Sequence, residues 1–258
     1  MMCLVNGNAQ NISNKGKSFW LGYGKNTSGT SNFMVYVSSE IDTKIDVYLL
    51  GGRVLFRSYQ VKANEVTLIG PLPVGNIHLD DEDVYASKSI NIRSEVPINV
   101  FSHVYSSKSS GATMLMPEEA FGYDYFAVTA QQTYKGRHHS WFYVIAKENN
   151  TKIEVTPSEA SHGGLAANTT ISKVLNKGEI YQVLGLSDNI ANTGVDLTGS
   201  RIKSVVNSDG NCYPIAVFSG NSRTAIDVDN GGDYIQQQIL PYAAWGYKYL
   251  TTPSVSSE

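Results

Sequence analysis

The same short sequence blocks occur twice along this chain, in the same order. Phe33–Val47 matches Trp141–Val155, with Phe33 over Trp141, and both copies contain Thr-Lys-Ile. The later pairs are Ser87–Ile92 with Gly199–Ser204 (Ile90 over Ile202), Pro97–Ser102 with Pro214–Ser219, and Pro117–Tyr125 with Pro241–Tyr249. The spacing between partners only grows along the chain, so insertions fall between collinear elements. We therefore predict duplication of a unit of roughly 100–120 residues, the size of an ordinary domain.

Alternation of apolar and polar residues within these blocks predicts strands. The segments Pro97–Val104 and Pro214–Asn221 have a period of two, which places one face inward and one outward. The chain has 16 Tyr, 8 Phe and 23 Gly, a composition that suits pleated strands and tight turns. We predict an all-β fold of two tandem antiparallel β-sandwich-like repeats. A propeller-like all-β fold is the alternative, but it would need repeats of about 40–50 residues.

The expected domain division lies near residues 130–140. It gives a first β repeat at 11–135 and a second at 136–258, with a first strand around Ser18–Gly24 that packs on either unit. Residues 1–10 are typical of the remnant of a signal peptide. Cys3 would be removed with that segment, so Cys212 is expected to stand alone without an internal disulfide. Helix is expected only in the single turn Pro117–Phe121.

Charge and hydropathy exclude two classes of protein. The chain has 20 basic and 23 acidic side chains and a net charge of −3, which argues against a nucleic-acid binder. It contains no run of 18 apolar residues, so we expect no transmembrane segment. At 41% hydrophobic residues, the chain can form a packed core.

No motif for catalysis or metal binding stands out. None of the histidines has a zinc-site spacing, and His138-His139 is interpreted as a solvated hinge. The acidic run at 80–83 could bind structural calcium, but an ordinary solvated loop is the simpler interpretation, so no cofactor is expected. Ser222 follows a strand but lacks the second glycine and the helix of a nucleophile elbow.

Loops at the ends of the strands are the best candidates for ligand contacts, since loops on a rigid scaffold commonly carry function. The loops Asp80–Tyr85 and Asp188–Asp196 occupy equivalent places in the two repeats. Tyr134, Tyr234 and Tyr242 lie in or beside loops and are expected to be exposed. The candidate ligand-binding residues are Asp81, Asp83, Tyr85, Asp188, Asp196 and Tyr234.

The aligned blocks resemble a known family, the N-terminal domain of the mucosal IgGFc-binding protein, which also occurs in secreted and surface proteins of Bacteroidetes-type bacteria. The resemblance runs from Gly16 to Thr252, and relatives usually continue beyond its end, so a fragment or a short member is expected. It is carried by Gly16–Trp20, Thr151–Val155, Asn176–Val183, Asp196–Ile202, Pro214–Asn221 and Leu240–Gly246. The sequence departs from the family pattern at Ser222, where relatives carry cysteine, and at Tyr234 and Gln237, where they carry histidine and glutamate.

The resemblance implies a secreted or cell-surface binding or adhesion module, not an enzyme, with an extracellular protein or glycan as its ligand. Binding of the immunoglobulin Fc part is not carried over, and the oligomeric state is open. One alternative is an extracellular carbohydrate-active enzyme, which would need two carboxylates about 5–10 Å apart in one cleft. A structural spacer within a larger surface protein is the other.

Overall fold

Antiparallel β-strands form every ladder among the described residues of the computed structural model, which are 13–26, 31–107, 109–133, 138–188, 193–225 and 231–250. In this part of the chain they build sheets of seven, five and four strands and a small hairpin. Three short 3₁₀ turns are also present there, at Val74–Asn76, Glu118–Ala120 and Tyr242–Ala244. The predicted all-β, antiparallel, sandwich-like fold is confirmed, as is the single turn after Pro117.

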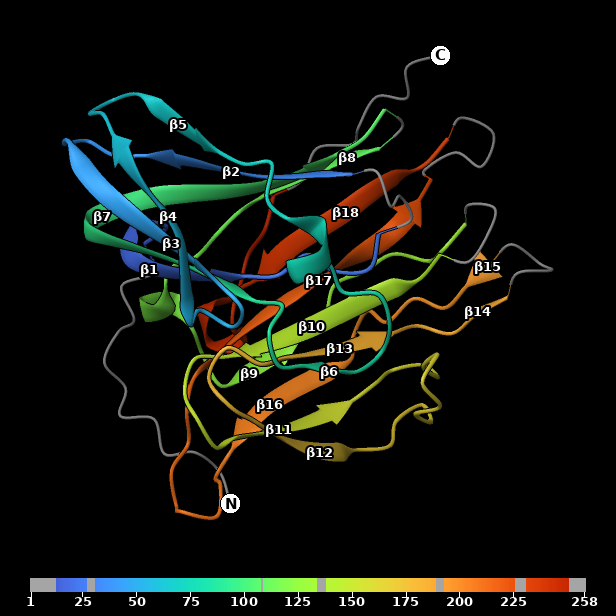
Figure 1. Ribbon diagram of the computed structural model, residues 1–258. Coiled ribbons are helices and arrows are strands. Elements are labelled where there is room, and N and C mark those ends of the chain that lie inside the picture. The colour runs from blue at the N-terminus through green and yellow to red at the C-terminus, as the bar shows by residue number, and fades with distance from the viewer. Residues whose placement is uncertain are drawn as a thin grey trace.

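The long strand β7 (Ile90–Tyr105) organises the first sheet. Its first half pairs with β1 (Gly16–Leu21) and β3 (Thr43–Leu49), and its second half pairs with β2 (Asn32–Ser38) and β8 (Ser110–Met114). The sheet is completed by β4 (Val54–Val61) beside β3 and β5 (Val66–Ile69) beside β2. Figure 1 shows β7 passing from the group around β2 to the group around β3.

Two further sheets lie below the first in the view of Figure 1. The middle sheet has the order β18 (Asp233–Ile239), β17 (Ile215–Thr224), β10 (Ser140–Ala146), β13 (Ile180–Leu184) and β6 (Val84–Tyr85). The outer sheet has the order β12 (Ile171–Leu175), β11 (Thr151–Thr156), β16 (Arg201–Val205) and β9 (Asp124–Phe126). The hairpin of β14 (Ser187–Asp188) and β15 (Thr193–Gly194) projects from one edge.

The central strands of the middle sheet, β10, β13 and most of β17, are buried on both faces, because a different core covers each side. All seven residues of β10 are buried. Trp141, Tyr143 and Ile145 face the core shared with the first sheet, and Phe142 and Val144 face the core shared with the outer sheet. Burial on both faces explains why the sequence of β10 is an almost unbroken apolar run.

The strand β1 and the residues after it contact both the first sheet and the middle sheet. The strand itself pairs with β7, while the hydroxyl of Tyr143 accepts a hydrogen bond from the amide of Gly22 and donates one to its carbonyl at 2.7 Å. A phenol buried in this way needs such partners, since an unsatisfied hydroxyl is costly.

Two expectations about individual residues are wrong. Cys212 is disulfide-bonded and does not stand alone; Cys3 and the rest of the proposed signal remnant lie outside the described residues. His138 and His139 are buried and do not form a solvated hinge, and the Nδ1 atom of His139 lies 2.8 Å from the carbonyl oxygen of Gly185.

Replacing Gly220 with alanine is expected to lower the free energy of unfolding by about 2 kcal/mol or more, because overpacking strains a dense core. A Cβ atom at this position would lie 1.9 Å from the carbonyl oxygen of Ile235. Gly75→Ala is the matched control, because no atom lies within 4 Å of its added Cβ. Urea titration followed by tryptophan fluorescence measures both, and equal stability of the two variants would contradict the packing of β17 on β18.

Candidate functional site

The loop Asp80–Tyr85, which we call the strap, leads into the middle sheet. Its last two residues form β6, which pairs with β13 of the middle sheet. The carbonyl of Asp81 accepts a hydrogen bond from Gln182 Nε2 at 2.8 Å, and that of Asp83 accepts one from the amide of Gln182 at 3.0 Å. The hydroxyl of Tyr85 accepts from the amide of Asp81 and donates to its carbonyl. The backbone of this loop is therefore committed to the fold, while the side chains of Asp81 and Asp83 are exposed.

Glu82 anchors the strap. Its carboxylate accepts hydrogen bonds from Ser161 Oγ at 2.8 Å, from the amide of Gly163 at 3.0 Å and from the amide of Leu184 at 3.1 Å. Sequence reasoning missed this residue, since nothing in a run of four acids distinguishes the one that turns inward. The donors lie about a hundred residues away, so only the fold reveals them.

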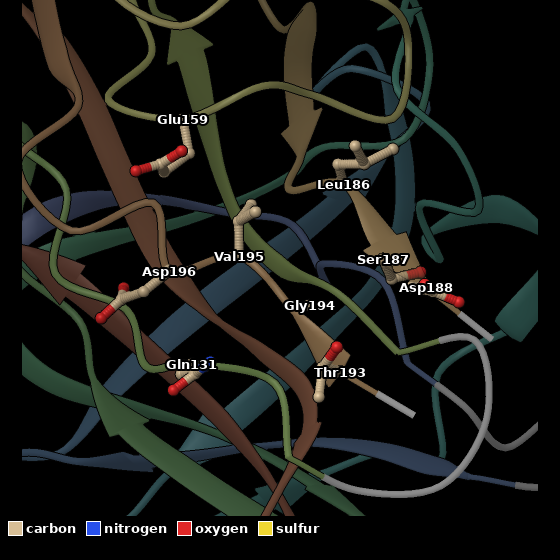
Figure 2. Close-up of a pocket in the computed structure, with 9 residues that line it drawn as sticks. All are labelled: Gln131, Glu159, Leu186, Ser187, Asp188, Thr193, Gly194, Val195 and Asp196. Atoms are coloured by element: carbon tan, nitrogen blue, oxygen red, sulfur yellow. The ribbon is translucent and has the colours of Figure 1, made fainter. Parts of the chain in front are cut away.

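Asp188 and Asp196, the two ends of the second candidate loop, line a groove of about 870 Å³. Figure 2 shows Gln131, Glu159 and Asp196 on one side of Val195 and Asp188 on the other. The remaining lining residues come from the β14–β15 hairpin and the residues next to it, and the full set is Gln131, Glu159, Leu186, Ser187, Asp188, Thr193, Gly194, Val195 and Asp196.

Asp196 is the most constrained carboxylate of the groove. Thr198 donates to its Oδ1 through both Oγ1, at 2.7 Å, and the backbone amide, at 2.9 Å, and Thr129 Oγ1 donates to the same atom. Partial burial opposes ionisation, but these hydrogen bonds outweigh it and hold the pKa of Asp196 below its usual range. Asp196 is thus a fixed negative charge at neutral pH.

The rest of the groove is open and acidic. Glu159 and Asp188 are exposed, and Leu186 adds an apolar surface with 46% of its area exposed. Carboxylates around an open groove attract cationic groups of a ligand. In the described part of the chain, no cluster of three His, Cys, Asp or Glu side chains could hold a metal ion.

The six predicted site residues lie in three different environments. Asp188 and Asp196 line the groove, and Asp81, Asp83 and Tyr85 belong to the strap. Tyr234 is only 2% exposed, donates a hydrogen bond to Gln236 Oε1 at 2.6 Å and lies 5.9 Å from Trp141 between ring centroids. The expectation that Tyr234 is exposed is wrong, because it lies on the inner face of β18.

Two other expectations can be compared with the structure. Tyr242 is exposed as predicted, whereas Tyr134 lies outside the described residues. Ser222 is completely buried in β17, and its hydroxyl bonds to the backbone amide and carbonyl of His139. It has the surroundings of a structural serine and is closed to any substrate.

Comparison with known proteins identifies the family. Residues 111–258, more than half of the chain, match the family described as IgGFc binding protein. The chain belongs to the IgGFc binding protein family. A human relative, the IgGFc-binding protein, is 27% identical over 173 residues, which are 66% of this chain and 3% of the human protein. No solved structure matches the chain significantly.

The family assignment confirms the resemblance drawn from the sequence blocks. The whole groove, from Gln131 to Asp196, falls inside the residues that match the family. This chain spans only a small part of the human relative. In the described residues no helix is long and apolar enough to cross a membrane.

Glu82→Ala is expected to destabilise the fold by about 2 kcal/mol, because the buried donors Ser161 and Leu184 and the exposed amide of Gly163 lose a charged acceptor. Asp83→Ala is the matched control in the same loop, since the Asp83 carboxylate accepts from the amide of its neighbour Val84. Thermal unfolding followed by circular dichroism measures both. A melting temperature of Glu82→Ala equal to that of the control would contradict the anchoring role.

Asp196→Asn is expected to lower the free energy of unfolding by about 1 kcal/mol at pH 7, a value reduced by solvent screening. The lowered pKa means that this stabilisation is present above the unfolded pKa of about 3.9 and is lost as the pH falls through the folded pKa. The two proteins should therefore converge in stability as the pH falls through the folded pKa of Asp196. Urea titrations from pH 7 to pH 2.5 test this, with Glu159→Gln as the exposed control; a gap that persists in acid would disprove the assignment.

Proposed function

We propose that this chain is a non-enzymatic binding module of a secreted or cell-surface protein, and that its acidic groove binds a protein ligand through a basic surface. The observation that carries the proposal is the open groove, which is lined by three carboxylates and an exposed leucine within the residues that match the family. Apolar contact with Leu186 would supply affinity, and the carboxylates would supply orientation and rate of encounter.

Membership of the family supports a protein as the ligand, since the human relative is named for binding the Fc part of immunoglobulin G. Glycans remain the second class of ligand to be tested, because exposed loops and tyrosines also suit sugars.

The groove gives less support to a carbohydrate-active enzyme. Such an enzyme needs one carboxyl group held neutral as a general acid and a second that is ionised. Asp196 has a lowered pKa and is ionised at neutral pH, and Glu159 and Asp188 are exposed to solvent. A spacer without any ligand does not account for the groove.

The disulfide at Cys212 supports an extracellular location, because disulfides persist in oxidising compartments. A structural disulfide in a protein of the reducing cytosol would be unusual. The location remains part of the proposal.

The test is surface plasmon resonance of the purified chain against immobilised immunoglobulin G Fc, mucin and a glycan panel. We expect saturable binding to a protein surface that weakens at least tenfold in the double variant Glu159→Lys/Asp188→Lys and falls with ionic strength as charges are screened. Glu65→Lys, an exposed charge reversal before β5, is the matched control.

Each outcome bears on a stated alternative. Binding that is equal in the groove variant and in the control would place the site elsewhere. Release of sugar fragments from the glycan panel would establish the enzyme, and the absence of binding to every surface by the folded chain would support the spacer.

A further inference from the structure

We propose that the chain consists of two copies of one sandwich unit, joined near Gly122, and that the exposed face of the first copy docks the second copy of another molecule, head to tail. The inference does not rest on the proposed function. It rests on a comparison of what the same strand positions contact in each copy.

Cross-strand partners define the equivalent positions. Val37 lies opposite Val100 in the first sheet, as Val144 lies opposite Val217 in the middle sheet. Phe19 and Val47 both lie opposite Ile92, and in the same way Tyr125 and Val155 both lie opposite Ile202. The pairs lie in both halves of the first sheet and in the middle and outer sheets, so the two copies are equivalent in structure as well as in sequence.

A contact between a glycine and a proline is also found in both copies. A Cβ atom on Gly16 would lie 2.2 Å from Pro117 Cβ, and one on Gly122 would lie 2.4 Å from Pro241 Cβ. Each copy thus begins with a glycine that packs against the proline before its own final 3₁₀ turn. This contact places the boundary near Gly122, so that β9 belongs to the second copy, in whose sheet it pairs.

The head face is the outer face of β2, β5 and β7, and we define it by Tyr36, Val66, Leu68 and Phe101. Tyr36 lies opposite Phe101, and the equivalent pair in the second copy is again a tyrosine and a phenylalanine, Tyr143 and Phe218. That second pair is completely buried against the first copy, with ring centroids 4.8 Å apart.

Exposure differs sharply at these equivalent positions. Phe101 is 41% exposed, and Val66, the equivalent of the buried Ile180, is 68% exposed. At Tyr36, Phe101 and Val66 the head face therefore carries side chains like those of the buried face, while Leu68 takes the place of Gln182. Among the described residues no further sheet covers Val66, Leu68 and Phe101. The second copy shows what such a face fits: the surface of another unit.

The surface on which such a face packs is also present in both copies. In the second copy we call it the tail face and define it by Val128 and Leu186. In the first copy the receiving residues are Gly22, which bonds to Tyr143, and Leu72, which is 2% exposed and belongs to the same buried cluster as Tyr143 and Phe218. Their equivalents in the second copy, Val128 and Leu186, are 51% and 46% exposed. In the second copy this receiving surface is exposed to solvent, whereas in the first copy it is covered.

The two free faces differ in a complementary way. A side chain at Gly22 would meet Ile180 Cδ1 at 2.7 Å, whereas the tail face carries Val128 at the equivalent place. The head face carries Val66 in place of Ile180, and valine lacks that Cδ1 atom. Because one molecule bears both faces, a second copy of the chain is the occupant that they fit. A contact between two different faces is heterologous and propagates in one direction.

The experiment is analytical ultracentrifugation of the full chain over a concentration series. We expect the mean mass of the wild type to rise past that of a dimer. The head variant Val66→Glu/Leu68→Glu and the tail variant Val128→Asp should each remain monomeric at concentrations at least tenfold higher. An equimolar mixture of the two should form a dimer and nothing larger, because it retains one intact head and one intact tail.

Val174→Glu is the matched control, an equally exposed apolar residue on β12, outside both faces. It should assemble as the wild type does. A monomeric wild type up to millimolar concentration would overturn the proposal, as would association that persists in both variants or a mixture that stays monomeric. Loss of association in the head variant but not in the tail variant would indicate a symmetric dimer and would also overturn it. None of Val66, Leu68 and Val128 lines the groove, so these variants leave the residues of the groove unchanged.

Discussion

Burial of the middle sheet on both faces is the constraint on which the rest of the structure depends. Its strand β10 contributes Trp141 and Tyr143 to one core and Phe142 and Val144 to the other. Each such side chain contributes about 1.5–3 kcal/mol when it leaves water. The first sheet is therefore needed to cover one face of the middle sheet, and separating the two would expose a large aromatic surface.

Polar contacts then fix how the layers meet. Apolar packing alone is not directional, so the strap with Glu82 and the hydrogen bonds between Tyr143 and Gly22 set the register of one unit on the other. Gln236 adds to this set, since its side-chain amide accepts from the amide of Gly24 and donates to the carbonyl of Gly22. The groove forms at the edge of this arrangement, where the second unit has no such covering layer in the described structure.

Sequence patterns predicted the strands and the sandwich, because alternation and turn residues are local signals. They did not predict the burial of Tyr234, since β18 reads as polar: its Gln236 and Gln238 are buried and take partners more than a hundred residues away. The alignment of Phe33 with Trp141 is also shifted by one residue. Cross-strand partners show that Met34 matches Trp141, so the interval from Met34 to Thr43 is one residue shorter than the interval from Trp141 to Thr151. Such a shift exchanges the two faces of a strand.

Leu186 connects the two proposals, since it lines the groove and also belongs to the tail face. A ligand that covers Leu186 and a second copy that covers the same residue compete for it, and this competition is reciprocal by thermodynamic linkage. Assembly through this contact would then determine how many grooves are accessible to a ligand. Only the last molecule of a head-to-tail row would present its groove fully, which would confine ligand binding to the end of the assembly.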